Sequence, residues 1–124
     1  MFRLADVYLM YAEAVLRGGG GSLANALNYV NLVRERAYGG ASGDIDQNTL
    51  DIDFILDERA RELYWEGHRR TDLVRFGKFS NTSYTWQWKG GVKEGASVSS
   101  NYDVFPIPSA DLGANPNLQQ NAGY

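Results

Sequence analysis

The 124-residue sequence contains no cysteine, a single histidine and only three prolines. Without cysteine the chain has no disulfide framework, no cysteine metal site and no thiol nucleophile. Its acidic and basic residues are interspersed and the net charge is −3, so no basic face for a phosphate backbone is visible and nucleic acid is not an expected partner. Long apolar runs are absent too. The run Val7–Ala12 is far shorter than the ~20 residues that a membrane-spanning helix needs. We expect this stretch not to be a signal peptide, because Asp6 and Glu13 interrupt the apolar run that one would need.

Helical periodicity dominates the first 79 residues. Apolar side chains recur at three- and four-residue spacing through Phe2–Arg17 and again through Leu23–Tyr38. Four glycines separate the two stretches, and Ser22 is placed to cap the second one. Because so short a connection forces neighbouring helices to run antiparallel, the pattern predicts a helical hairpin.

A third helix is predicted to begin after Asp51 and to end at Gly67, which would take the left-handed position past the helix end. A short fourth helix is predicted for Arg70–Phe76. Between the hairpin and the third helix, the Gly-, Ser- and Asp-rich segment Gly39–Leu50 is typical of a loop.

The third predicted helix carries glutamates at positions i, i+4 and i+8, namely Glu58, Glu62 and Glu66. Like charges at this spacing destabilise an isolated helix by ~0.2–0.5 kcal/mol per pair. We therefore expect cations from other segments to meet this acidic stripe and to lock the helices together. The candidates are Arg34, Arg36, Arg69 and Arg75.

Two metal-site interpretations fit the acidic residues poorly. A di-metal carboxylate site in a bundle uses Glu-x-x-His on facing helices, whereas here one residue separates Glu66 from His68 and no second Glu/His helix is present. The segment Asp44–Asn48 begins like a calcium loop, but Thr49 stands where glycine is needed and Ile55 where glutamate is needed. We expect no metal ion and no other cofactor.

After Phe79 the helical period ends. Aromatic residues from Tyr84 to Trp88 alternate with polar ones, and Gly90-Gly91 follows, so the pattern allows a short β-hairpin whose return strand includes Val92 and Val98. The last twenty residues hold all three prolines and are expected to form an ordered, extended tail packed on the helices.

Four aromatic residues of this region are the candidate ligand-binding residues. Flat aromatic rings present a large apolar face with a polar handle, which suits stacking on the C–H faces of sugar rings. Nearby Asn81, Gln87, Lys89 and Asn101 could supply hydrogen bonds to hydroxyl groups. The alternative is that the rings simply bury against the helices or against the missing N-terminal part of a longer protein, since half-buried strands attract aromatic residues. The four candidates are Tyr84, Trp86, Trp88 and Tyr102.

Four segments, in this order, resemble the C-terminal part of the SusD/RagB family of outer-membrane lipoproteins: RLADVYLMYAEAV, ALNYVNLVRERA, ILDERARELYWEGHRRTDLVRFGKF and FPIPSADLGANPNLQQNAGY. One departure is Ala122, where the family's closing motif has proline. Because family members are several times longer, the chain is expected to be a C-terminal fragment. We expect residues 1–124 to form a single domain, helical over 1–79 and irregular over 80–124.

The resemblance implies a mainly α fold of tetratricopeptide-like helical hairpins with a long irregular C-terminal segment. It also implies a function in the Bacteroidetes: cell-surface glycan binding and delivery to a SusC-like TonB-dependent outer-membrane transporter for nutrient uptake. The protein would lie on the extracellular face of the outer membrane through an N-terminal lipid anchor that this chain lacks. It would be a binding protein without catalytic residues, not an enzyme. The alternative is a helical scaffold that contacts a partner protein and no sugar.

Overall fold

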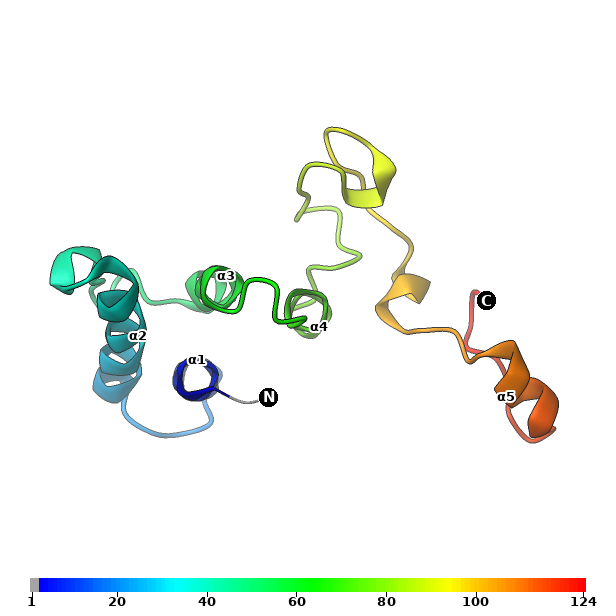
Figure 1. The fold of residues 1–124 in the computed structure, drawn as a ribbon, viewed down its shortest axis with the longest axis horizontal. Coiled ribbons are helices and arrows are strands. Elements are labelled where there is room, and N and C mark those ends of the chain that lie inside the picture. Colours follow the sequence, from blue (N-terminus) through cyan, green and yellow to red (C-terminus); the bar gives the residue numbers. More distant parts are fainter. Residues whose placement is uncertain (1–2) are drawn as a thin grey trace. The chain divides into compact units, whose positions relative to one another are not determined.

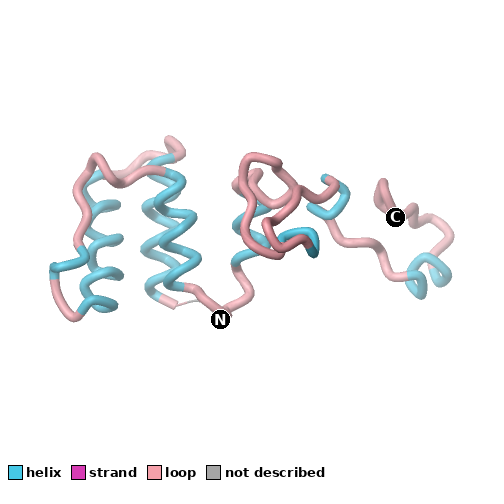
Figure 2. The backbone as a smooth tube through the Cα atoms, turned by 90° about the horizontal axis from the view of Figure 1, so that it is seen from above, coloured by secondary structure: helices cyan, strands magenta, loops and turns pink. Residues whose placement is uncertain are grey.

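The computed structural model describes residues 3–124, which form helices and loops with no β-strand in that range (Figures 1 and 2). The mainly α fold predicted from the sequence is confirmed. The chain divides into two compact units, residues 1–72 and 73–124, and each is described by itself. The expectation of a single domain stays a prediction. In chain order the α-helices are α1 (Leu4–Leu16), α2 (Leu23–Tyr38), α3 (Ile52–Glu62), α4 (Arg69–Arg75) and α5 (Ser109–Ala114).

The predicted helical hairpin is confirmed: α1 and α2 lie side by side at the start of the first unit (Figure 2). Ser22 is the N-cap of α2, and its side chain accepts a hydrogen bond from the backbone N–H of Asn25 at 3.3 Å. The backbone N–H of Ser22 in turn donates to the hydroxyl of Tyr11 at 3.1 Å. The turn is thus tied to α1 as well as to α2, which fixes the antiparallel entry of the second helix.

The core of the first unit lies where α1, α2 and α3 meet. Ala12 and Ala26 are fully buried at the contact between the first two helices, and their small side chains let the backbones approach closely. Leu50 and Ile55 bring the start of α3 against the same cluster. The buried cluster consists of Leu9, Ala12, Ala26, Val30, Leu50 and Ile55.

The start of α3 agrees with the prediction, because the side chain of Asp51 accepts a hydrogen bond from the backbone N–H of Phe54 at 2.7 Å. Its end does not agree. The helix stops at Glu62, and residues 63–67 form a turn in which Trp65 has a left-handed φ of 64°. Nη2 of Arg3 donates to the carbonyl oxygen of Glu62 at 2.7 Å. A side chain from another segment therefore satisfies a terminal carbonyl of the helix, a partner that local sequence could not indicate.

In the second unit the predicted β-hairpin is wrong. Trp88 has a left-handed φ of 68°, and residues Lys89–Gly91 form a 3-10 turn where two strands were expected to meet. Strand pairing needs extended backbone on both sides of the turn. Here the side chain of Lys89 is buried, only 3% of the residue being exposed, and the chain coils around it.

The last segment is ordered, although part of it is helical where an extended tail was expected. Residues Ser109–Ala114 form α5 directly after Pro108. The side chain of Gln120 accepts from the backbone N–H of Ile107 at 2.8 Å and donates to its carbonyl oxygen at 2.9 Å. The hydroxyl of Tyr124 donates to the carbonyl oxygen of Val104 at 3.0 Å. Side-chain hydrogen bonds of this kind, and not a strand ladder, hold the tail in position.

Candidate functional site

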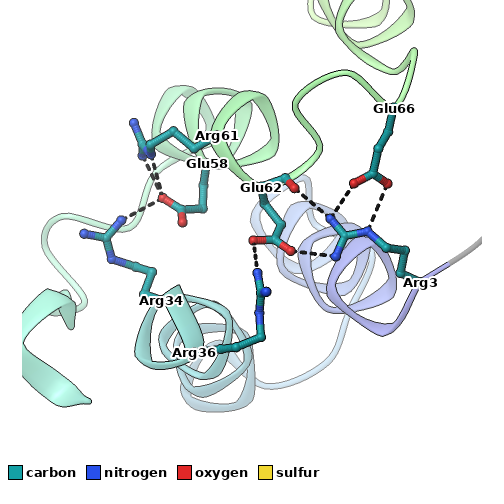
Figure 3. A network of polar contacts seen from close by, with 7 residues as sticks. All are labelled: Arg3, Arg34, Arg36, Glu58, Arg61, Glu62 and Glu66. Carbon is teal, nitrogen blue, oxygen red and sulfur yellow. Dashed lines mark hydrogen bonds and ion pairs between the residues drawn. The ribbon is translucent and has the colours of Figure 1, made fainter. Parts of the chain in front are cut away.

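The acidic stripe of the first unit is fully engaged by arginines, as Figure 3 shows. Oε2 of Glu58 lies 2.7 Å from Nη1 of Arg34 and 2.7 Å from Nη2 of Arg61. Arg36 pairs with Oε2 of Glu62. The side chains of Glu58 and Glu62 are each 6% exposed, so their charges need these partners to remain buried.

Arg3 joins the start of α1 to the end of α3. Its Nη1 lies 2.7 Å from Oε1 of Glu62, and its Nη2 lies 2.7 Å from Oε1 of Glu66 (Figure 3). These hydrogen bonds, the one to Glu66 first, raise the pKa of the Arg3 guanidinium further. The same hydrogen bond lowers the pKa of Glu66. One guanidinium thus fastens both the last turn of the helix and the loop beyond it.

The predicted partners of the stripe are therefore correct in part. The pairings of Arg34 and Arg36 are confirmed. Arg69 donates to the carbonyl oxygen of Leu56 at 3.2 Å. The pairing of Arg69 and Arg75 with the stripe stays a prediction. Arg3 and Arg61 were not among the partners predicted from the sequence. For Arg61 the signal was present, because it stands three residues after Glu58.

A second charged cluster is buried in the first unit and was also not predicted from the sequence. Nη1 of Arg59 lies 2.8 Å from Oδ1 of Asp6, and its Nε lies 2.8 Å from Oδ2 of Asp72. All three residues are at most 4% exposed. The helical periodicity could have indicated this cluster, since Arg59 follows Ile55 at the spacing of the apolar face of α3.

The second unit holds the predicted ligand-binding aromatics, and the structure brings two of them together. The rings of Tyr84 and Trp86 meet edge to face, with centroids 6.2 Å apart. Nζ of Lys89 lies 4.7 Å from the centroid of the Trp86 ring and donates to the carbonyl oxygens of Asn81 at 3.1 Å and Tyr84 at 2.6 Å. A buried ammonium therefore sets both the course of the loop and the position of the indole.

Trp88 is 66% exposed and Trp86 is 38% exposed. The indoles thus offer apolar surface to solvent. Tyr102 makes its ring contact with Tyr124, at a centroid distance of 6.4 Å and an interplanar angle of 90°. The role of all four candidates in ligand binding stays a prediction.

The polar neighbours differ in what they could offer a ligand. Lys89 was expected to bond to ligand hydroxyls, but its ammonium is buried and donates to the protein's own carbonyls. Oδ1 of Asn81 accepts from the backbone N–H and the hydroxyl of Ser83, both at 2.7 Å. Gln87 is exposed. Asn101 lines a shallow pocket of about 470 Å³ together with Ser99, Ser100 and Asn121.

Within residues 3–124 we find no group of three or more histidine or acidic side chains arranged to hold a metal ion. No helix in that part of the chain is long and apolar enough to span a membrane. Outside the arginine network, the pKa of Asp46 is lowered by hydrogen bonds from the hydroxyl and then the backbone N–H of Thr49. The described residues offer two kinds of interaction, namely contact with exposed aromatic rings and ion pairing.

Comparison with known proteins agrees with this architecture. The model of the SusD family matches residues 1–124. The starch-binding protein SusD of Bacteroides thetaiotaomicron is 45% identical over 124 residues, which are all of this chain and 21% of that protein. The SusD-like protein P25 of Formosa agariphila is 36% identical over 132 aligned positions, covering all of this chain and 24% of that protein.

Solved structures give the same result. A SusD superfamily protein from Bacteroides vulgatus matches with a TM-score of 0.76 at 34% identity, over 99% of this chain and 27% of that one. Surface glycan-binding protein A from Bacteroides thetaiotaomicron matches with a TM-score of 0.77 at 34% identity, over 98% of this chain and 24% of that one. The chain thus spans about a fifth to a quarter of the length of these relatives. It belongs to the SusD family.

Proposed function

We propose that these residues are the C-terminal part of a longer cell-surface protein that binds a glycan and delivers it to a SusC-like TonB-dependent transporter of the outer membrane. Two relatives support the binding role, one named as starch-binding and one as surface glycan-binding. The protein would sit on the extracellular face through a lipid anchor outside this chain. Its task is capture and transfer, with no chemical step.

The observation that carries the glycan-binding part is the aromatic surface of the second unit. The ammonium of Lys89 and the ring of Tyr84 both contact the indole of Trp86. Part of the indole remains open to solvent. A ring held in this way loses little conformational entropy on binding. Sugar C–H faces would stack on it, and the exposed Trp88 would extend the surface.

The first unit would act as the scaffold. Its arginine–carboxylate pairs tie α1, α2 and α3 to one another, and buried polar networks of this kind specify one arrangement of helices when every member is satisfied. This observation also favours the alternative function, a helical scaffold that contacts a partner protein and no sugar. The two proposals differ in whether Trp86 and Trp88 contact the sugar.

Alanine substitution in the full-length protein separates them. We expect W86A and W88A to weaken glycan affinity about tenfold each, equivalent to about 1.4 kcal/mol, measured by titration calorimetry against a panel of α- and β-glucans and other polysaccharides. Trp65→Ala is the matched control, because Trp65 is an exposed tryptophan of the first unit. Wild-type affinity in both variants would remove these residues from the sugar site and leave the scaffold function.

Iodide quenching of tryptophan fluorescence gives a second comparison. Under the glycan-binding proposal, saturating glycan shields Trp86 and Trp88 from iodide, and the shielding is absent in a double W86A/W88A variant. An assay for released reducing sugar is run in parallel. Sustained release would overturn the assignment as a binding protein without catalysis.

A further inference from the structure

The second unit contains a polar pocket whose lining includes neither Trp86 nor Trp88. It has a volume of about 470 Å³ and lies between residues 99–104 and residues 121–123. The first of these segments includes the 3-10 turn Ser100–Asp103, and both belong to the same compact unit. We call this feature the tail pocket.

Contacts across the tail pocket hold its two walls together. The hydroxyl of Tyr124 lies 3.2 Å from the carbonyl oxygen of Asn101 and 3.0 Å from that of Val104, so it ties the first wall to the residue that follows the second. Gly123 has a left-handed φ of 93°, and a Cβ atom there would come within 2.6 Å of Cβ of Asn101. Only glycine lets the walls approach this closely. The pocket is therefore formed before any ligand arrives, which lowers the entropic cost of binding.

The polar groups of the tail pocket are hydroxyls and carboxamides. The side chains of Ser99 and Ser100 form no hydrogen bond within the part of the chain that the structure describes. Nδ2 of Asn121 donates to the carbonyl oxygen of Phe105 at 2.7 Å, which orients the carboxamide and leaves its Oδ1 as an acceptor. Asn101 presents a second carboxamide. A hydroxyl can both donate and accept, whereas a carboxamide oxygen only accepts, so the pocket offers both kinds of hydrogen bond.

This chemistry fits a ligand with several hydroxyl groups and no charge. Among the described residues, no lysine, arginine, aspartate or glutamate lines the tail pocket, so a phosphate or an ammonium would find no counter-charge there. Val104 is 48% exposed and supplies an apolar patch for the C–H face of a sugar ring. Tyr102 stands between the lining residues Asn101 and Val104 and is 51% exposed, which adds an aromatic face with a polar handle. The volume is in the range of about 300–1,000 Å³ that is typical of small-molecule sites.

We propose that the tail pocket is a second glycan subsite, separate from the aromatic loop, which takes one pyranose residue of a neutral polysaccharide. Ser99, Ser100 and Asn121 hydrogen-bond to the sugar hydroxyls, while Val104 and Tyr102 contact its C–H groups. A long polysaccharide can engage this subsite and the two tryptophans at once, and two linked contacts raise the affinity above that of either alone. The inference rests on the proposed glycan-binding function and adds a site to it.

Thiol labelling in the full-length protein shows whether sugar enters the tail pocket. The 124 residues contain no cysteine, so Ser99→Cys places a thiol in the pocket, and mass spectrometry of the peptide that contains it follows its reaction with maleimide. The probe is the polysaccharide of the calorimetric panel that the wild-type protein binds most tightly. We expect it, at saturation, to slow the labelling about fivefold or more. Ser109→Cys, at an exposed position outside the pocket, is the matched control and should react at an unchanged rate.

The same measurement in the W86A/W88A background tests whether the subsite is separate. Polysaccharide at a concentration raised to offset the weaker binding of this variant should still protect the thiol of Ser99→Cys. Loss of the protection would mean that sugar reaches the tail pocket only as an extension of the aromatic loop, and would overturn the proposal of a separate subsite.

Removing the two hydroxyls measures what the tail pocket contributes to affinity. We expect Ser99→Ala/Ser100→Ala to bind the polysaccharide about fivefold more weakly than the wild type in calorimetry, since two hydrogen bonds to sugar are lost. Ser42→Ala/Ser109→Ala, which changes two exposed serines outside the pocket, should bind as the wild type does. Circular dichroism checks that both variants are folded. An affinity of Ser99→Ala/Ser100→Ala within about twofold of the wild type overturns the proposal.

The results distinguish the subsite from the function on which it rests. If the wild-type protein binds no glycan of the panel, the proposed function is wrong and the subsite is wrong with it. If the wild-type protein binds glycan but Ser99→Cys is labelled at the same rate with and without polysaccharide, only the subsite is wrong.

Discussion

Arg59 on α3 donates from Nη1 to Oδ1 of Asp6 on α1 at 2.8 Å, across a sequence separation of 53 residues. Both side chains are almost entirely buried, at 4% and 3% exposure. Desolvating such charges is costly, and their mutual attraction offsets the cost only while the geometry is complete. The docking of α1 on α3 therefore depends in part on this buried guanidinium.

Replacing the guanidinium of Arg59 should strongly destabilise the fold. We expect Arg59→Leu to lower the free energy of unfolding by about 3–5 kcal/mol, because the buried carboxylates of Asp6 and Asp72 lose their ion pairs with its guanidinium. Urea titration followed by circular dichroism measures the change. Arg36→Leu is the control. Its side chain is 63% exposed, so it should cost less than about 1 kcal/mol, and equal losses in both variants would contradict the argument.

Arg3→Ala should loosen the end of α3 and the turn after it. The substitution removes hydrogen bonds to the side chain and carbonyl oxygen of Glu62 and to Glu66. We expect a loss of about 1 kcal/mol, discounted for the partial exposure of Arg3. Hydrogen exchange should accelerate at the N–H of Glu66, which donates to the carbonyl oxygen of Leu63 at 3.1 Å.

Arg3→Lys should rescue only part of this loss, because an ammonium cannot donate to both carboxylates in the planar geometry of a guanidinium. If exchange in the turn is unchanged in Arg3→Ala, the capping role of Arg3 is wrong.

Stability should fall in acid, in part through Glu66. Its pKa is lowered in the folded state by the hydrogen bond from Arg3. A carboxylate with a lowered folded pKa stabilises the fold above its unfolded pKa of about 4.3, and the contribution is lost as the pH falls through the folded value. We expect Glu66→Gln to flatten the dependence of the unfolding free energy on pH below about pH 5.

The control is the same substitution in an Arg3→Ala background. There Glu66 has lost the main partner that lowers its pKa, so Glu66→Gln should flatten the pH profile much less. A flattening of equal size in both backgrounds would show that Arg3 is not the cause.

Lys89→Met should disturb the aromatic surface without touching an exposed group. The carbonyl oxygens of Asn81 and Tyr84 would lose the hydrogen bonds from its ammonium, and a hydrogen bond to a charged group contributes about 1.5–3 kcal/mol. We expect a shift in tryptophan emission and weaker glycan binding by the full-length protein. Lys93→Met, at an exposed position four residues on, should change neither. Unaltered emission in Lys89→Met would show that Trp86 does not depend on the ammonium.

Much of the first unit follows from local sequence. The hairpin, its Ser22 cap and the Asp51 cap of α3 depend on residue spacing and on side chains within a few positions. The pairing of the acidic stripe with Arg34 and Arg36 also followed, because three like charges on one helix demand cations from elsewhere. The end of α3 did not follow, since Arg3, far away in the sequence, satisfies its last carbonyl.

The second unit was less predictable for a related reason. Alternating aromatics favour a strand, but a strand needs a partner for its backbone groups. Burial of Lys89 supplied other partners for the carbonyls and turned the chain at Trp88. Sequence could mark the tryptophans as candidates, but it could not show which of them an ammonium would fix.

By itself the sequence determined the first four helices, most of their boundaries and the family, because these depend on periodicity, caps and ordered motifs. Tertiary structure decided which charges are buried together, where α3 ends and how the aromatic loop folds. Those outcomes depend on groups that meet only in space, such as Asp6 with Arg59 and Arg3 with Glu62. Their energies come from desolvation and geometry, which no local pattern of residues records.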